Sequence, residues 1–220
     1  MAQNPTLELQ ESRILRILLA AANDGQGMTG PNRQVLFVRH GQSLHNADKG
    51  SAGIDPALSD SGLVQSLRLH GLPIFSDCEL LVVSPLSRAV QTAAAAFGEH
   101  PGCRTVLTPL HTERCSSTSD QGRSKSDLVQ RFPFIESWEG FAELEEEWTP
   151  DYSTDKTWRE TRVPAFLEWL SEQPEKRIVV VGHGAFFSAL LGRYLANCEV
   201  AEFVESAHGG RERLRGWQGL

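Results

Sequence analysis

Val35-Leu-Phe-Val-Arg-His-Gly41 is the stretch from which the fold can be worked out. Four apolar, mainly β-favouring residues lead straight into an arginine, a histidine and a glycine, which predicts a buried strand ending in a turn. A second run, Arg177-Ile-Val-Val-Val-Gly-His-Gly184, ends in the same way. Open α/β sheets bind ligands at the carboxyl ends of their parallel strands. We therefore expect Arg39, His40 and His183 to meet at one edge of a parallel sheet.

Strands alternate with helices along most of the chain. Further strands are predicted at 80–83, 104–107 and 197–204, and helices at 58–69, 86–97, 158–172 and 185–194. This alternation is typical of a single α/β domain, with a mainly parallel central sheet in a three-layer α/β/α arrangement.

The predicted domain spans residues 33–204 and has additions at both ends. Residues 1–32 hold an amphipathic helix over 7–22 and a glycine-rich connector. That helix is expected to pack either on the body of the protein or on a second subunit, which would make a homodimer. Residues of about 110–155 show little periodicity, which is typical of a lid or binding rim. Residues 205–220 are expected to form a flexible polar tail.

Composition excludes several classes of protein. The chain is 40% hydrophobic and 22% charged, as soluble domains are, and its net charge of -7 argues against nucleic-acid or anionic-membrane partners. It has no apolar run of 18 residues, so no membrane span is expected. Arg16 interrupts the apolar stretch 14–22, which disfavours a signal or transit peptide. Four scattered cysteines without a CxxC or metal-ligand pattern predict reduced thiols and a cytoplasmic location.

A third strand end supplies another cation. Ser84-Pro-Leu-Ser-Arg88 follows the predicted strand at 80–83 and places Arg88 in the first turn of a helix, where anions are favoured. Two arginines and two histidines at one sheet edge would suit a dianion such as phosphate. Each histidine alone is more often structural, so only the combination indicates a site. The other histidines lack such context and are expected at the surface: His45, His70, His100, His111 and His208.

These residues resemble the histidine phosphatase superfamily, also called phosphoglycerate-mutase-like. The matching motifs, in the family's order within residues 33–204, are Arg39-His-Gly-Gln-Ser-Leu-His-Asn46, Leu58-Ser-Asp-Ser-Gly62, Ser84-Pro-Leu-Ser-Arg-Ala-Val-Gln-Thr92 and Val181-Gly-His-Gly184. The middle of the chain is similar to plant and fungal members, through Glu113-Arg114, Asp120-Gln-Gly-Arg-Ser-Lys-Ser-Asp127, Phe132-Pro133 and Asn197-Cys-Glu199.

The resemblance implies a role for each matching residue. His40 would be the nucleophile that becomes a phosphohistidine. Arg39, Arg88 and His183 would clamp the phosphoryl oxygens. Asn46 and Gly184 would complete the phosphate site. Glu113 would act as general acid and then as general base. No metal and no cofactor are implied.

Three functions follow from the resemblance. The first is a phosphatase acting on a small phosphorylated metabolite or, as an alternative, on a phosphoprotein. Arg114 and Arg123 would then form a basic rim that selects an anionic substrate, although solvated side chains would look the same. The second is phosphoglycerate-mutase-type transfer, which is disfavoured because 47–57 lacks the tryptophans and the Gly-Trp-x-Asp element of cofactor-dependent mutases. The third is a silent phospho-ligand-binding or scaffold protein.

Overall fold

The computed structural model describes residues 33–48, 53–149, 157–204 and 216–217. The helix predicted over 7–22 lies outside these residues. So does most of the expected tail, of which only β6 (Gly216–Trp217) is described.

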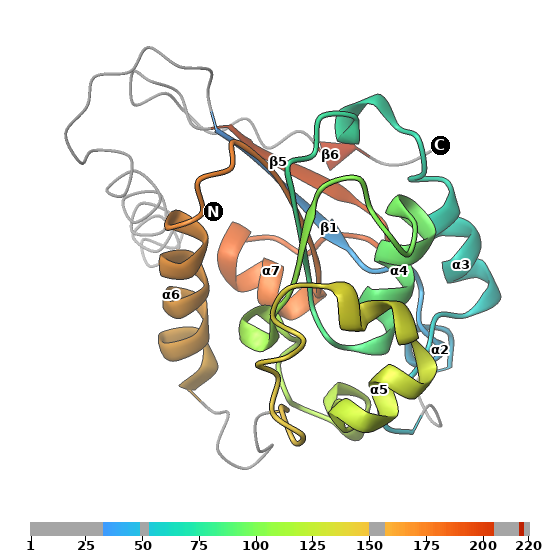
Figure 1. The fold of residues 1–220 in the computed structure, drawn as a ribbon. Coiled ribbons are helices and arrows are strands. Elements are labelled where there is room, and N and C mark those ends of the chain that lie inside the picture. The colour runs from blue at the N-terminus through green and yellow to red at the C-terminus, as the bar shows by residue number, and fades with distance from the viewer. Residues whose placement is uncertain (1–32, 49–52, 150–156, 205–215, 218–220) are drawn as a thin grey trace, which may run out of the picture.

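A single sheet of six strands forms the centre of the described chain (Figure 1). Its strands are β1 (Gln34–Arg39), β2 (Leu80–Val83), β3 (Arg104–Leu107), β4 (Arg177–Gly182), β5 (Val200–Val204) and β6. The order is β3-β2-β4-β1-β5-β6. The pairs β2–β3, β2–β4 and β1–β4 are parallel, whereas β5 runs antiparallel to β1 and to β6. The expected mainly parallel sheet is confirmed, with an antiparallel edge.

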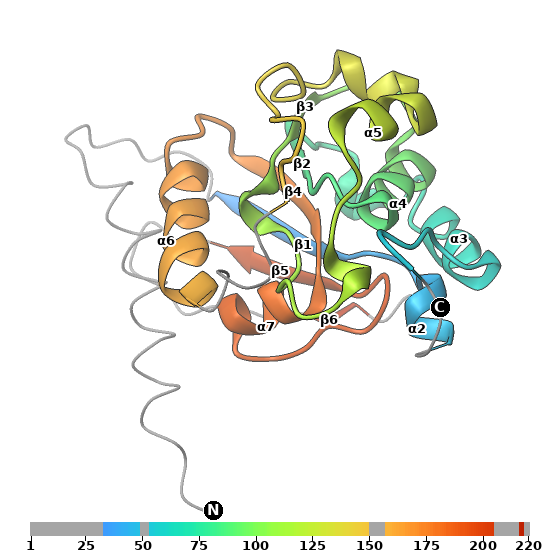
Figure 2. The same cartoon turned by 90° about the horizontal axis from the view of Figure 1, so that it is seen from below.

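Helices cover both faces of the sheet, in three layers (Figures 1 and 2). Side chains such as Leu36 and Val38 pack on the side of α4 (Ser87–Phe97) and α5 (Lys125–Arg131), with α3 (Asp60–Leu67) beside α4. The alternate residues Val35 and Phe37 pack on the side of α6 (Trp158–Ser171) and α7 (Gly184–Leu191). Because successive strand residues point to opposite faces, a continuous apolar run suits a strand buried on both.

The structure departs from the sequence predictions at several boundaries. The helix predicted to reach Tyr194 ends at Leu191, because Gly192 adopts a left-handed conformation with φ 70° that stops α7. The short helix α2 (Leu44–Ala47) follows β1, where no helix was predicted. The last strand begins at Val200 rather than at position 197.

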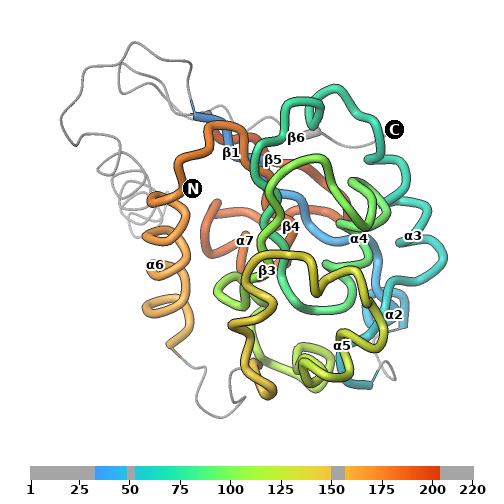
Figure 3. The backbone as a smooth tube through the Cα atoms, viewed as in Figure 1, coloured from blue at the N-terminus to red at the C-terminus, as the bar shows by residue number. Residues whose placement is uncertain are grey.

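The segment between β3 and α6 is a long excursion, coloured green to yellow in Figure 3, and its described residues, 108–149, contain no strand. It carries η3 (Pro109–His111), η4 (Thr118–Asp120), α5 and η5 (Pro133–Ser137); a further short helix, η2 (Pro73–Phe75), precedes β2. Among the described residues, no helix has the length and apolar character needed to cross a membrane.

Candidate active site

The two histidines lie side by side because β1 and β4 end in register. Arg39 pairs with Gly182, and the next backbone N–H, that of His40, donates to the Gly182 carbonyl at 3.0 Å. The ring centroids of His40 and His183 are 5.2 Å apart, and both side chains are buried. The convergence expected from the two strand ends is therefore present.

The His40 ring is held in one tautomer. Its Nδ1 lies 2.7 Å from the carbonyl oxygen of Gly41. A carbonyl can only accept, so Nδ1 carries the proton and Nε2 keeps its lone pair. Burial lowers the pKa of His40 well below its ordinary value, and the charges of Arg88 and Arg39 lower it further. The imidazole is thus neutral at neutral pH.

His183 leaves one ring nitrogen without a partner. Its Nε2 lies 2.7 Å from the Ser84 hydroxyl, at the end of β2. Its Nδ1 is buried and has no hydrogen-bond partner among the described residues. Burial, followed by the charge of Arg88, lowers the pKa of His183 well below its ordinary value. An unpaired buried nitrogen of this kind is costly unless a ligand satisfies it.

Arg39 shows the same incompleteness. One terminal nitrogen donates to the Leu195 carbonyl at 2.7 Å, but the buried Nε has no partner among the described residues. A Cβ on Gly184 would lie 3.1 Å from that Nε and 3.2 Å from Cζ of Arg39. Gly184 therefore allows the close approach of the guanidinium to the start of α7.

Arg88 is anchored by the excursion between β3 and α6. Its two terminal nitrogens donate to the Ser119 carbonyl at 2.9 Å and to Asp120 Oδ1 at 3.3 Å. The other oxygen of Asp120 accepts hydrogen bonds from Ser116 and Ser117. The excursion, for which a lid or rim role was predicted, therefore fixes the position of the buried Arg88 guanidinium.

A buried carboxylate that sequence reasoning missed caps the helix of Arg88. Asp55 accepts from the Ser87 N–H at 2.8 Å and from the Ser87 hydroxyl at 2.6 Å. It satisfies a donor at the start of α4, whose own N-cap residue supplies no side-chain bond. Its backbone has φ 45°, and a polar loop residue so far from Ser87 gives no sequence signal of this contact.

Glu113 bonds to the opposite helix start. Its carboxylate accepts from the backbone N–H groups of Ala185 and Phe186, at 3.0 and 3.3 Å, and from that of Arg114 at 3.0 Å. Burial raises the pKa of Glu113, against the lowering effect of Arg88. The carboxyl group therefore lies beside the two arginines with an increased tendency to hold a proton.

A cavity of about 300 Å³ connects these groups. It is lined by Arg39, His40, Ser43, His45, Asn46, Arg88, Glu113, Arg114, Ser116, Ser117, Asp120, Gly184, Ala185 and Tyr194. His183 lies next to His40 but does not belong to the lining. Arg123 is also outside it, and its guanidinium donates to the Ile54 carbonyl at 3.4 Å. The structure thus brings Arg114, but not Arg123, to this cavity.

Asn46 and Asn197 form the wall beside His40. Asn46 Oδ1 accepts from the Ser43 N–H at 3.2 Å and from Asn197 Nδ2, also at 3.2 Å. Asn197 Nδ2 in addition donates to the His40 carbonyl at 3.0 Å. Asn197 belongs to a motif shared with plant and fungal members, so its family resemblance was the available signal for this contact.

The prediction that His111 lies at the surface is wrong. His111 is fully buried, with Nε2 3.1 Å from the Val181 carbonyl and its ring 5.0 Å from that of Phe166. The apolar shell lowers its pKa to about 4. Since the apolar neighbours come from α6 and α7, nothing in the local sequence indicated their proximity.

Among the described residues, no group of three or more histidine, cysteine or acidic side chains could hold a metal ion. The positive charge at the cavity is that of Arg39, Arg88 and Arg114. Guanidinium groups of this kind can bind an anion.

Comparisons with known proteins point to one family. Residues 35–210 match the model of the histidine phosphatase superfamily (branch 1). A probable phosphatase of Schizosaccharomyces pombe is 31% identical, over 70% of this chain and 76% of its own. A phosphoglycerate mutase-like protein of Arabidopsis thaliana is 26% identical, over 80% of each chain.

The fold is also that of solved phosphatase structures. The structure of a putative α-ribazole-5′-P phosphatase from Escherichia coli superimposes with a TM-score of 0.58 at 19% identity, covering 84% of this chain and 97% of that one. Because the family model matches most of its length, the chain belongs to the histidine phosphatase superfamily, branch 1.

Proposed function

We propose that this chain is a phosphomonoesterase in which His40 attacks phosphorus and becomes a phosphohistidine. The observation that carries the proposal is the bond between His40 Nδ1 and the Gly41 carbonyl, made by a buried ring that lines a cavity with three arginines. Because the bond places the ring proton on Nδ1, the lone pair of Nε2 is available to attack phosphorus. The lowered pKa keeps the imidazole neutral and nucleophilic at neutral pH.

The unpaired donors would stabilise the charge on the transferring phosphoryl group. Arg39 Nε lacks a partner among the described residues, and so does His183 Nδ1. If the Ser84 hydroxyl donates to His183 Nε2, the ring proton lies on Nδ1 and is available to a phosphoryl oxygen. Arg88, held by Ser119 and Asp120, would add a positioned cation. Preorganised donors of this kind lower the barrier without reorganising during the reaction.

Glu113 is the proposed acid and base. In the first step its proton passes to the leaving oxygen as the ester P–O bond breaks and the bond from Nε2 to phosphorus forms. In the second step the carboxylate takes a proton from water, whose oxygen displaces His40 and releases phosphate. The raised pKa supports the first step, because more of the carboxyl group is protonated near neutral pH.

The proposed substrate is a small phosphorylated metabolite. A cavity of about 300 Å³ matches a small molecule. Outside the phosphate position it presents Arg114, His45 and the largely exposed Tyr194, which favours an anionic group or a ring on the substrate. The E. coli structure named above is likewise described as a phosphatase of a small phosphorylated compound. A phosphoprotein substrate, the role of Arg123, a homodimer and a cytoplasmic location stay predictions.

The test compares hydrolysis of phenyl phosphate by the wild type, His40→Ala and His100→Ala. We expect His40→Ala to lose about 10³-fold or more of kcat/KM, because the nucleophile is gone. His100 is exposed at the other end of the sheet, so His100→Ala should keep wild-type turnover. Equal rates for wild type and His40→Ala would show that His40 is not the nucleophile.

The two alternatives are tested with the same preparations. Conversion of 3-phosphoglycerate to its 2-isomer in the presence of bisphosphoglycerate, faster than hydrolysis, would identify a mutase instead. Tight binding of inorganic phosphate without turnover on a broad panel of phosphomonoesters would identify a silent binding protein.

A further inference from the structure

Two thiols that are well separated in sequence meet at the amino end of the sheet. Cys78 precedes β2 and Cys103 precedes β3, and these two strands are parallel neighbours. The sulfur atoms are 3.5 Å apart, in hydrogen-bond contact. Both residues are partly buried and pack against the core on the α4 side of the sheet.

We propose that Cys78 and Cys103 form an oxidation site, at which a peroxide converts the two thiols into a reversible disulfide. This site is separate from the phosphate cavity and does not depend on the proposed phosphatase activity. A disulfide bond is about 2 Å long, so the sulfur atoms have to approach by about 1.5 Å, which side-chain rotation can supply.

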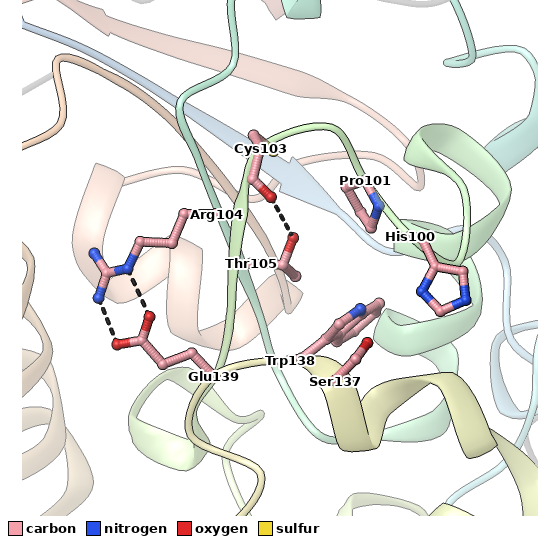
Figure 4. A pocket seen from close by; sticks show the side chains of 8 residues that line it. All are labelled: His100, Pro101, Cys103, Arg104, Thr105, Ser137, Trp138 and Glu139. Atoms are coloured by element: carbon pink, nitrogen blue, oxygen red, sulfur yellow. Dashed lines mark hydrogen bonds and ion pairs between the residues drawn. The ribbon is translucent and has the colours of Figure 1, made fainter.

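Cys103 is the cysteine of the pair that lies at a cavity. It lines a cavity of about 350 Å³, whereas Cys78 does not, although both residues are partly buried. Figure 4 shows Cys103 and Thr105 between the Arg104–Glu139 pair on one side and His100, Ser137 and Trp138 on the other. A cysteine at a cavity with a second sulfur in contact suits the pairing of a reacting with a resolving cysteine.

The neighbouring thiol also favours ionisation of Cys103. When Cys103 loses its proton, the Cys78 thiol donates a hydrogen bond to the thiolate, which lowers the pKa of Cys103 to about 7. The same contact raises the pKa of Cys78, so Cys78 keeps its proton. The thiolate is the reactive form of cysteine, so the contact with Cys78 favours oxidation at Cys103.

The reaction consumes one peroxide for each pair. The Cys103 thiolate attacks one peroxide oxygen, the O–O bond breaks, and the leaving hydroxide takes a proton to give water and a sulfenic acid. Cys78 sulfur then attacks Cys103 sulfur, the S–O bond breaks, and hydroxide leaves with the proton of Cys78 as a second water. Two thiols are oxidised to one disulfide, and an added dithiol reverses the change by exchange.

The other two cysteines supply controls within the same chain. Cys115 and Cys198 are both buried. Cys198 lies 3.7 Å from the Ser66 hydroxyl, and burial raises its pKa to about 11. Peroxide should therefore reach Cys115 and Cys198 more slowly than Cys103.

The experiment treats the full-length native protein with increasing hydrogen peroxide, alkylates the remaining thiols after denaturation, and maps the peptides by mass. We expect a Cys78–Cys103 disulfide to form at least about tenfold faster than any oxidation of Cys115 or Cys198, and to disappear with a dithiol. If Cys78 and Cys103 are oxidised no faster than Cys115 and Cys198, the proposal is overturned.

Single variants separate the two roles. In Cys78→Ser, a sulfenic acid should accumulate on Cys103, where dimedone traps it, and the pH midpoint of Cys103 alkylation should move upward from its value in the wild type. In Cys103→Ser, Cys78 should stay reduced at the same peroxide dose. A Cys78 that reacts equally fast without Cys103, or an unchanged pH midpoint in Cys78→Ser, would show a packed thiol pair with no oxidation chemistry. Circular dichroism checks that each serine variant is folded.

Discussion

The two ends of the parallel sheet carry cavities of similar size and similar residue types. The carboxyl end has about 300 Å³ with arginines, histidine and Glu113, and the amino end has about 350 Å³ with Arg104, His100 and Glu139. The two cavities differ in how many of their hydrogen-bond donors already have protein partners. Arg104 bonds Glu139 through two nitrogens, at 2.6 and 2.7 Å, and Gln173 and Glu175 through the third, both at 3.0 Å.

At the carboxyl end, in contrast, Arg39 Nε and His183 Nδ1 are buried without partners among the described residues. A guanidinium whose nitrogens all face carboxylate or amide oxygens has little left for an anion, whereas an unpaired buried donor favours one. Donors left unsatisfied, rather than cavity size or residue type, distinguish the proposed active site from a surface ion-pair cluster.

The largest effect is expected from exchanging arginine for lysine at each end. Arg39→Lys and Arg88→Lys should each lower kcat/KM by roughly 10²- to 10³-fold, because lysine lacks the fork of donors. Arg104→Lys is the matched control and should stay within about twofold of wild type in the same assay with phenyl phosphate. A loss for Arg104→Lys as large as that for Arg88→Lys would remove the distinction between the two ends.

The next effect concerns the two glutamates, whose pKa values are shifted in opposite directions. Burial raises the pKa of Glu113, while the Arg104 bond lowers that of Glu139. As the acid, Glu113 must be protonated, so activity should fall as pH rises through its raised pKa. His40 must be neutral, so activity should also fall as pH drops through its lowered pKa.

Glu113→Gln should abolish the high-pH limb of kcat/KM and lower turnover of an alkyl phosphate by about 10²-fold or more, with a smaller loss for a good aryl leaving group. Glu139→Gln should leave the pH profile in place. An intact high-pH limb in Glu113→Gln would assign the acid role to another group.

A buried ionisable side chain that does not line the cavity should affect stability rather than turnover, and His111 tests this. Its pKa in the folded state is about 4, below the ordinary 6.5, so the unfolded chain binds the extra proton first as pH falls. The stability contributed by the neutral ring is present above pH 6.5 and is lost as pH falls toward about 4, by up to roughly 3 kcal/mol.

His111→Phe should therefore reduce the slope of unfolding free energy against pH by up to one proton between those values. The Val181 carbonyl keeps a donor in this variant, because the Ser84 N–H also bonds it at 3.2 Å. Urea titrations at several pH values measure the slope, and an unchanged slope would mean that His111 does not titrate as described.

The smallest effect is expected from removing the ion-pair cluster. Arg104 and Glu139 are substantially exposed, so their attraction is screened by solvent. Arg104→Ala should lower the free energy of unfolding by less than about 1 kcal/mol, measured by urea denaturation. A destabilisation of several kcal/mol would show that this end of the sheet depends on the cluster.

The layers and strand ends could be predicted from the sequence because buried parallel strands are continuous apolar runs. Val35 to Val38 and Ile178 to Val181 show this pattern, and both ends place a histidine at the same edge. The antiparallel pairing of β5 could not be predicted, since pairing direction depends on the path of the chain and not on the composition of the strand.

The parts of the site that could not be predicted depend on tertiary contacts. Asp55 caps α4 from a distant loop, and Asp120 holds Arg88. Away from the site, the contact of Cys78 with Cys103 is of the same kind. His111 was expected at the surface because it lacks the strand-end context of His40 and His183, whereas its burial comes from Phe166 and Phe186. No local pattern marks such contacts, because each joins segments far apart in sequence.

The most direct test of the central claim is to trap the phosphoenzyme. Glu113→Gln is mixed with a radiolabelled aryl phosphate, quenched in alkali, in which phosphohistidine survives, and digested for peptide mapping. The account predicts one labelled phosphoryl group on the peptide that contains His40, and no label on that peptide in a variant that also carries His40→Ala. Turnover without any labelled protein, or a label on another residue, would contradict it.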